Sequence, residues 1–194
     1  MAGSYEIVQA LHIGEKEVVL GIDEANTNGQ KYMVAYCFTN ELFSSYEDGL
    51  VSDNYAEIVK YYGERVAEQA ETMKTQLEQL DIPTEVITAE QCYTNDYGES
   101  IDGKVIAIKA SCIRPEYQRA DSQIFLVDGG FGANANSRGS AVFCYNVYSG
   151  KHTRWERRDV EGVIKDEALP DWAKDKLKTM TVEKLRNDKS KGER

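Results

Sequence analysis

The segment from residue 53 to residue 80 constrains the fold most, because it predicts one long amphipathic helix between two strand-rich stretches. Apolar side chains recur along it at intervals of three, four or seven residues, as on one face of an α-helix. They are Tyr55, Val59, Tyr62, Val66, Met73, Leu77 and Leu80. Asn54 and Glu57 have the spacing of a capping box, and Pro83 prevents the helix from continuing.

The stretch before this helix predicts three strands, at residues 5–11, 16–23 and 30–38. The second and third alternate in polarity and are separated by a polar segment that ends in Asn28-Gly29. Asn-Gly supplies the positive φ angles of a tight hairpin turn. We therefore expect a projecting N-terminal β-hairpin over residues 16–38, which serves function rather than folding.

The stretch after the helix also consists mainly of predicted strands. They lie at residues 104–109, 124–127, 141–148 and 152–158. Pro170 favours a short helix from Asp171 to Met180, and a charged tail follows at residues 181–194. The order of elements predicts one α+β domain over residues 1–180, with a mixed or mostly antiparallel sheet packed by the long helix.

Charge is distributed unevenly along the chain. Residues 1–100 hold 19 acidic and 5 basic residues, whereas residues 101–194 hold 14 acidic and 18 basic ones. An acidic surface favours a basic protein partner, although a row of glutamates is also typical of a solvated helix face. The candidate partner-binding residues are Glu64, Glu68 and Glu71 on the helix, and Asp23 and Glu24 at the hairpin tip.

Basic residues concentrate between residues 151 and 158, where Arg154, Arg157 and Arg158 flank Trp155. Arginine beside an aromatic ring suits phosphate binding and base stacking, but these arginines could equally pair with acidic residues of the chain. Together with Arg138 in the glycine-rich loop at residues 129–139, they are the candidate nucleic-acid-binding residues. We expect Trp155 to belong to the core and at least one arginine to face a partner.

The sequence gives no support to several kinds of chemistry. The four cysteines form no CxxC pair and there are only two histidines, so a structural zinc site is not expected. The loop Gly130-Phe131-Gly132 lacks the third glycine of a dinucleotide fingerprint, and no GxSxG motif surrounds a serine. We therefore predict no catalytic residue, no metal and no cofactor. No apolar run is long enough to span a bilayer, and no secretory signal is evident, so we expect a cytoplasmic protein with reduced thiols.

A family resemblance covers residues 103–177. The segments that carry it are Ile113-Arg114-Pro115-Glu116-Tyr117, Gln123-Ile124-Phe125-Leu126, Gly129-Gly130-Phe131-Gly132, Arg138-Gly139, Arg154-Trp155, Gly162-Val163-Ile164 and Leu169-Pro170-Asp171-Trp172-Ala173. This pattern resembles a module in proteins of conjugative elements and plasmids of Firmicutes. The chain would then consist of an acidic hairpin-and-helix part over residues 1–100 and this module over residues 101–180.

The resemblance implies a function in host-defence evasion. Small acidic proteins of mobile elements include the type II-A anti-CRISPR proteins, which this chain looks similar to. That likeness implies a non-catalytic protein of the bacterial cytoplasm that binds a type II CRISPR effector nuclease and no membrane. The bound effector would then be blocked from engaging its guide RNA or double-stranded DNA. Two alternatives are a nuclease that trims guide RNA and a DNA-binding accessory protein of a conjugative element.

Overall fold

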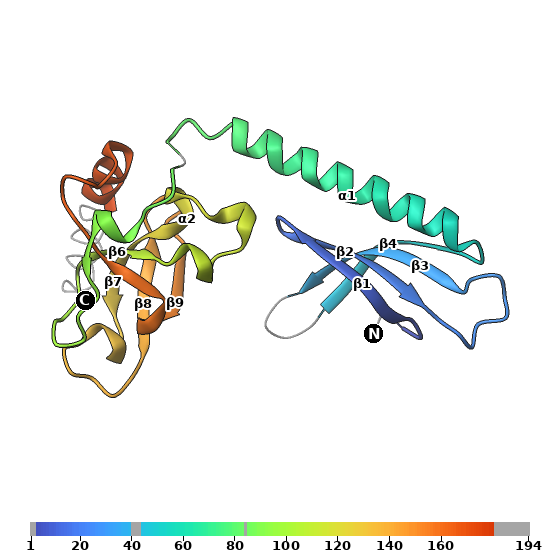
Figure 1. The fold of residues 1–194 in the computed structure, drawn as a ribbon, viewed down its shortest axis with the longest axis horizontal. Coiled ribbons are helices and arrows are strands. Elements are labelled where there is room, and N and C mark those ends of the chain that lie inside the picture. The colour runs from blue at the N-terminus through green and yellow to red at the C-terminus, as the bar shows by residue number, and fades with distance from the viewer. Residues whose placement is uncertain (1–2, 40–43, 84, 181–194) are drawn as a thin grey trace, which may run out of the picture. The chain divides into compact units, whose positions relative to one another are not determined.

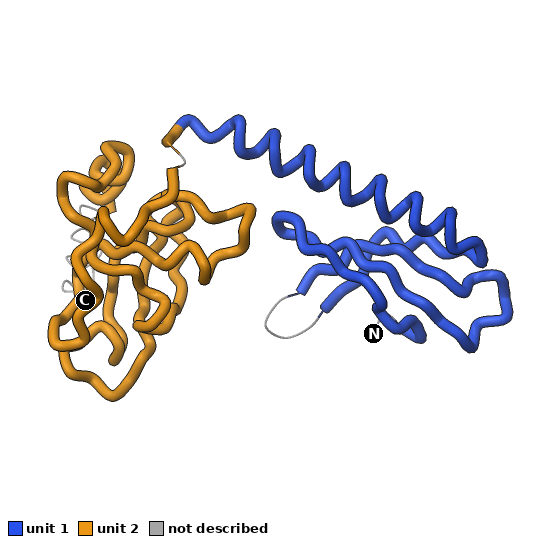
Figure 2. The backbone as a smooth tube through the Cα atoms, viewed as in Figure 1, with its two compact units in different colours: residues 1–81 blue, residues 82–194 orange. Residues whose placement is uncertain are grey.

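The computed structural model describes residues 3–39, 44–83 and 85–180, and the predicted tail at 181–194 lies outside these ranges. The chain divides into two compact units: unit 1 comprises residues 1–81 and unit 2 comprises residues 82–194 (Figure 2).

The fold class is α+β with antiparallel sheets, as predicted, but each unit has a sheet of its own. The sequence predicted one domain over residues 1–180, whose two parts meet at residue 100. The boundary instead follows the end of the long helix, close to Pro83, because no strand is shared between the two sheets.

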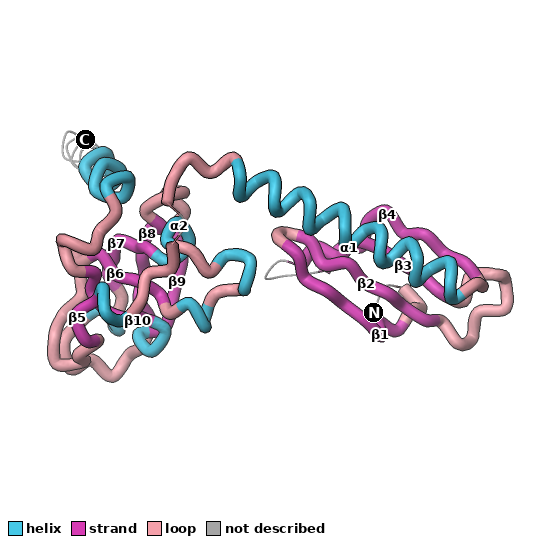
Figure 3. The backbone as a smooth tube through the Cα atoms, turned by 45° about the horizontal axis from the view of Figure 1, so that its top comes forward, coloured by secondary structure: helices cyan, strands magenta, loops and turns pink. Residues whose placement is uncertain are grey.

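Unit 1 is a four-stranded antiparallel sheet with one helix on it. Its elements are β1 (Glu6–Ile13), β2 (Lys16–Ile22), β3 (Tyr32–Thr39), β4 (Ser44–Ser52) and α1 (Tyr55–Glu78). The strands lie in the sheet in their sequence order, and α1 runs along one face of them (Figures 1 and 3). Strand β4 was not predicted, because it has few large apolar side chains.

The predicted hairpin is present, but it does not project from unit 1. Strands β2 and β3 pair in register from Glu17 opposite Cys37 to Ile22 opposite Tyr32, and they are the two central strands of the sheet. Their side chains supply most of the buried residues of unit 1. Since only the polar tip between the strands is exposed, the expectation that the hairpin contributes nothing to folding was wrong.

Helix α1 begins as predicted, but it buries a different stripe of side chains. The side-chain oxygen of Asn54 accepts hydrogen bonds from the backbone N–H groups of Ala56 and Glu57 at 3.1 and 3.4 Å. The buried residues of the helix are Ile58, Tyr62 and Gln69, whereas Val59 is 41% exposed. Ile58 and Tyr62 pack against alternate residues of β2 and β3, so the position of the sheet selects the buried face.

Unit 2 is a six-stranded antiparallel sheet in the order β5-β10-β6-β7-β8-β9. The strands are β5 (Cys92–Thr94), β6 (Val105–Ile108), β7 (Ile124–Gly129), β8 (Ala141–Asn146), β9 (His152–Glu156) and β10 (Val160–Ile164). Short helices connect them: α2 (Ala120–Gln123), η1 (Ala89–Gln91), η2 (Ala110–Cys112), η3 (Pro115–Tyr117), η4 (Phe131–Ala133) and η5 (Arg157–Asp159). The predicted helix α3 is present at residues 171–180.

The sheet of unit 2 carries apolar clusters on both faces. Phe125 and Val142 belong to one cluster, and Ile124 and Leu126 belong to the other, where Trp172 and Leu177 of α3 cover part of the sheet. The glycine-rich loop has a structural explanation. Gly130 has a φ of 98°, and a side chain at Gly132 would collide with the carbonyl oxygen of Ser140.

Candidate functional site

The three helix glutamates predicted to bind a partner lie on the exposed side of α1. Glu64 is 3.6 Å from the ammonium of Lys60, and Glu71 is 3.5 Å from that of Lys74. Both pairs are solvent-exposed, so they hold these carboxylates only weakly. Glu68 is also exposed, but one carboxylate oxygen accepts a bond from the Tyr36 hydroxyl at 3.2 Å.

The two acidic residues of the hairpin tip are partly engaged by other residues of unit 1. Asp23 accepts the backbone N–H of Ala25 at 3.1 Å, and its pKa is lowered chiefly by a hydrogen bond from Ser4. Glu24 lies 2.6 Å from the ammonium of Lys31, whose pKa that contact raises. Asp23 therefore shapes the turn, whereas the Glu24 side chain is 76% exposed.

The division into units sharpens the charge asymmetry. Unit 1 holds 15 acidic and 5 basic residues, so it carries the entire net charge of −10, whereas unit 2 holds 18 of each. Helix α1 contributes only −2, with five glutamates against three basic residues, and residues 1–54 contribute −7. The acidity that was ascribed to the helix thus lies mostly on the strands and turns of unit 1.

The four predicted nucleic-acid arginines are in two kinds of environment. Arg138, Arg154 and Arg158 are exposed. Arg154 pairs with Glu156 on its own strand, and the guanidinium of Arg158 is 3.8 Å from Asp159. Arg157, in contrast, is only 2% exposed.

The burial of Arg157 contradicts its assignment to nucleic acid. Its guanidinium donates to the side-chain oxygen of Asn95 at 2.8 Å, to the carbonyls of Asp96 and Glu99 at 2.7 and 3.3 Å, and to that of Gly132 at 3.2 Å. The cation also lies 5.3 Å from the centre of the Tyr97 ring. Burial lowers the pKa of Arg157, against an opposing influence of Tyr97 and Asp96. Arg157 therefore connects the end of β9 to the loop at residues 95–99 and to the loop that contains Gly132.

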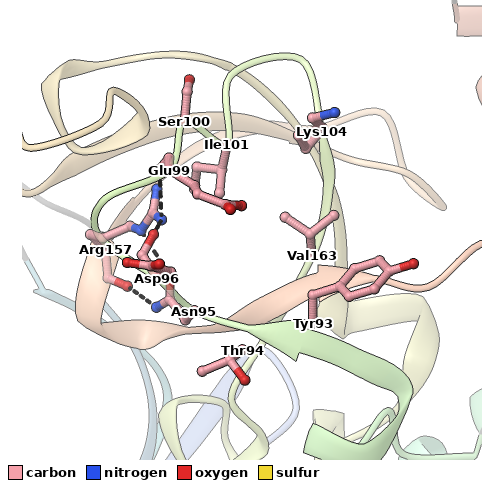
Figure 4. Close-up of a pocket in the computed structure, with 10 residues that line it drawn as sticks. All are labelled: Tyr93, Thr94, Asn95, Asp96, Glu99, Ser100, Ile101, Lys104, Arg157 and Val163. Carbon is pink, nitrogen blue, oxygen red and sulfur yellow. Dashed lines mark hydrogen bonds between the residues drawn. The ribbon is translucent and has the colours of Figure 1, made fainter.

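These contacts form one wall of a pocket of about 300 Å³ (Figure 4). Its lining residues are Tyr93, Thr94, Asn95, Asp96, Glu99, Ser100, Ile101, Lys104, Arg157 and Val163. The Glu99 carboxylate extends toward the middle of the pocket, whereas the Tyr93 hydroxyl and the Lys104 ammonium point away from Arg157 (Figure 4). Because the guanidinium already bonds to the protein, the pocket presents no free cation at this wall.

Among the described residues, the free cysteines Cys37, Cys92 and Cys144 are buried and Cys112 is exposed. In the described part of the chain, no group of three or more His, Cys, Asp or Glu could hold a metal ion. Burial raises the pKa of Cys92 to about 11 and that of Cys144 to about 12, so both thiols are protonated at neutral pH and are poor nucleophiles. In residues 3–39, 44–83 and 85–180, no helix has the length and apolar character needed to cross a bilayer.

Strands β8 and β9 carry a row of aromatic side chains that was not predicted to be a functional surface. Phe143 and Tyr145 of β8 lie on one face of the sheet, together with His152 and Arg154 of β9. Trp155 lies on the other face, where it packs against the core cluster and meets Phe125 edge-to-face at 5.9 Å. The prediction that Trp155 belongs to the core is thus confirmed. The alternation of Phe143 and Tyr145 along β8 was the available signal for the missed residues.

Comparisons with models of known protein families, with curated proteins and with solved structures gave no match. The resemblance of residues 103–177 to a mobile-element module therefore stays a prediction.

Proposed function

We propose that the protein is a non-catalytic inhibitor whose acidic unit 1 binds a basic protein surface. The separation of charge carries this proposal, since unit 1 has a net charge of −10 and unit 2 a net charge of zero. Surfaces of opposite potential steer one another into encounter and fix the orientation of the complex. A partner with a basic surface would therefore meet unit 1 rather than unit 2.

The partner that we propose is a type II-A CRISPR effector nuclease of the bacterial host. Such a nuclease holds its guide RNA and target DNA in a positively charged channel. An acidic protein in that channel would exclude guide RNA or double-stranded DNA by occupying their place. The resemblance to proteins of mobile elements supports this choice, because an element that enters a bacterium gains from such an inhibitor.

Two alternatives give different outcomes in the same assays. A nuclease that trims guide RNA would shorten the RNA catalytically, at amounts of protein far below those of the effector. A DNA-binding accessory protein of a conjugative element would bind duplex DNA without the effector. The proposed inhibitor instead forms a complex with the effector, and inhibition requires at least equal amounts of the two proteins.

Partner binding can be tested with a charge variant of α1 and a control of equal charge. The variant is Glu64→Lys, Glu68→Gln and Glu71→Lys, in which glutamine keeps an acceptor for the Tyr36 hydroxyl. The control is Asp102→Lys, Asp166→Lys and Glu167→Gln, which alters three exposed residues of unit 2. Each triple variant changes the net charge by +5, so only the location of the change differs.

We expect the helix variant to weaken binding to purified effector by about tenfold at low salt and to flatten the salt dependence, because long-range attraction is screened by ions. The control should bind like the wild-type protein. Equal losses in both variants would show that only net charge matters. Absence of a complex with the effector, with or without guide RNA, would reject the proposed partner.

A further inference from the structure

The outer face of strands β8 and β9 exposes a ledge of rings at one edge of the six-stranded sheet of unit 2. Val142 and Cys144 of β8 point into the core and are fully buried, whereas Phe143 between them is 41% exposed. The His152 side chain on β9 is 46% exposed. Exposed rings on neighbouring strands are available for contact with a flat ligand.

The rings of this aromatic ledge (Phe143, Tyr145 and His152) are arranged side by side. The planes of Phe143 and His152 differ by only 15°, with centroids 6.2 Å apart, and the centroid of Tyr145 is 4.6 Å from that of His152. The register places Tyr145 opposite His152, and Phe143 opposite Arg154. A guanidinium thus adjoins the rings on the same face of the sheet.

A fourth ring lies in the loop next to the ledge. Phe131, on η4, is 76% exposed, the largest exposure of any large apolar side chain in the described residues. The preceding residue, Gly130, lies directly against Phe143: a side-chain carbon added there would be 3.1 Å from the Phe143 ring. The loop therefore brings Phe131 close to the ledge.

The charge around these rings favours an anion. Residues 131–158 hold five basic residues and one acidic residue. Arg157 is buried and its guanidinium is hydrogen-bonded within unit 2, but four basic residues are exposed: Arg138, Lys151, Arg154 and Arg158. Three carboxylates oppose them: Glu156 pairs with Arg154, Asp159 is 3.8 Å from the guanidinium of Arg158, and Asp128 is 3.9 Å from His152. The four exposed cations still outnumber these three acidic groups.

We propose that the aromatic ledge and Phe131 bind single-stranded nucleic acid by base stacking, with the surrounding cations contacting the phosphates. Rings on adjacent strands of an antiparallel sheet stack unpaired bases, each of which has an aromatic face. A duplex keeps its base faces covered and cannot use such a ledge. This activity belongs to unit 2 and does not depend on the proposed function of unit 1.

The test is a fluorescence-anisotropy titration of the full chain with labelled 12-nucleotide oligonucleotides of deoxyuridine and of uridine, and with a 12-base-pair duplex. We expect both single strands to bind and the duplex to bind at least tenfold more weakly. The ratio between the two single strands reports whether the ribose 2′-hydroxyl contributes. No binding of either strand at low salt, or tighter binding of the duplex, would overturn the proposal.

Matched variants locate the surface. Phe143→Ala, His152→Ala and Phe131→Ala should each raise the Kd by about fivefold or more, the loss expected for one stacked base. Tyr93→Ala is the control, because Tyr93 is an aromatic residue 59% exposed on β5, at the opposite edge of the same sheet. Its Kd should equal that of the wild-type protein.

The salt dependence provides a second readout, which does not rely on the rings. Arg154→Ala should reduce the slope of log K against log salt by about 0.7, the change for one lost phosphate contact on a single strand. Phe131 is so exposed that its removal cannot perturb the core, so Phe131→Ala stays informative if Phe143→Ala is unstable. Unchanged binding in Phe131→Ala and His152→Ala would reject the assigned surface.

Discussion

Units 1 and 2 are both antiparallel sheets with helices, yet they hold their interiors together differently. In unit 1, each strand pairs with its neighbour in the sequence, and Gln69 is the only polar residue that is buried among the described ones. In unit 2, β10 lies between β5 and β6, and the buried polar residues are Asp121, Gln123, Asn146 and Arg157. Unit 1 thus combines pairing between consecutive strands with an almost wholly apolar interior, whereas unit 2 combines pairing between distant strands with buried polar side chains.

Three of the four buried polar residues of unit 2, Gln123, Asn146 and Arg157, join segments that are distant in the sequence, whereas the Asp121 carboxylate pairs with Arg119 only two residues away. Gln123 exchanges bonds with the backbone of Ile87 at 2.8 and 3.1 Å and donates to the carbonyl of Ile108 at 3.0 Å. Asn146 donates to the carbonyl of Asp121 at 2.8 Å. The comparison teaches that irregular connections leave backbone groups without partners, and that buried side chains then have to supply them.

Arg157→Ala is the strongest test of this difference. It should lower the stability of unit 2 by about 4 kcal/mol, because several buried carbonyls and the Asn95 side chain lose their donor together. Both tryptophans, Trp155 and Trp172, lie in unit 2, so tryptophan fluorescence in urea follows that unit alone. Arg158→Ala is the control and should change stability by less than about 0.5 kcal/mol, since the Arg158 side chain is 82% exposed. Equal effects of the two substitutions would show that Arg157 does not hold the loops.

Ile58→Ala tests the apolar core of unit 1. Loss of this fully buried side chain should reduce the stability of unit 1 by about 3 kcal/mol, through lost burial and the cavity that remains. Hydrogen exchange of peptides from residues 1–81 measures the effect, while tryptophan fluorescence reports whether unit 2 stays folded. Val59→Ala, at a neighbouring and 41% exposed position, should cost less than about 1 kcal/mol. A larger loss for Val59→Ala would place the other face of α1 on the sheet.

Alkaline pH should separate the two units by their thiols. Cys92 and Cys144 have pKa values raised by burial to about 11 and about 12, so the folded state of unit 2 retains protons that the unfolded state releases from about pH 9 upward. The thiols therefore stabilise unit 2 fully below pH 9, and their contribution is lost as pH rises toward 12. Between pH 8 and pH 10 the expected loss is about 3 kcal/mol for the two thiols together, measured by urea titration of tryptophan fluorescence.

A cysteine variant provides the control for this pH dependence. Cys144→Ala should be less stable at pH 8 but lose less stability on going to pH 10 than the wild-type protein. The buried tyrosines of unit 1 have pKa values raised above 10, chiefly by burial, so their contribution is lost only at higher pH. If unit 1 weakened before unit 2 below pH 10, the assignment to these thiols would be wrong.

Asn54→Ala should give the smallest effect, and only in unit 1. The Asn54 side chain caps two backbone N–H groups of α1, and loss of such a cap costs about 1 kcal/mol. Hydrogen exchange in the first turns of α1 should accelerate, with no change in tryptophan fluorescence. Asn54→Asp is the control, since aspartate keeps an acceptor at this position. If Asn54→Asp were as destabilising as Asn54→Ala, the cap would not account for the loss.

Most individual elements of this protein were predictable from local patterns. The start of α1 at Asn54, its end before Pro83 and the β8–β9 hairpin around Gly150 each depend on residues within a few positions of one another. The β2–β3 hairpin was also predicted, although a loop from Ile22 to Tyr32 and not a tight Asn28-Gly29 turn joins its strands, and only Gly29 of that pair has a positive φ. Such signals act through backbone geometry, which neighbouring residues fix. The separation of charge between the two parts of the chain was also evident from the sequence, although its boundary lies near residue 81 rather than residue 100.

The environment of each side chain, in contrast, was decided by the tertiary structure. The basic segment that suggested phosphate contacts contains Arg157, whose acceptors include carbonyls 58 and 61 residues away in the sequence, so no local pattern distinguishes it from its exposed neighbour Arg158. Likewise, the sequence determined that α1 is amphipathic, but the pairing of β2 with β3 decided that Ile58 and not Val59 is buried. Burial depends on which distant segments pack together, because a side chain loses contact with water only when another part of the chain covers it.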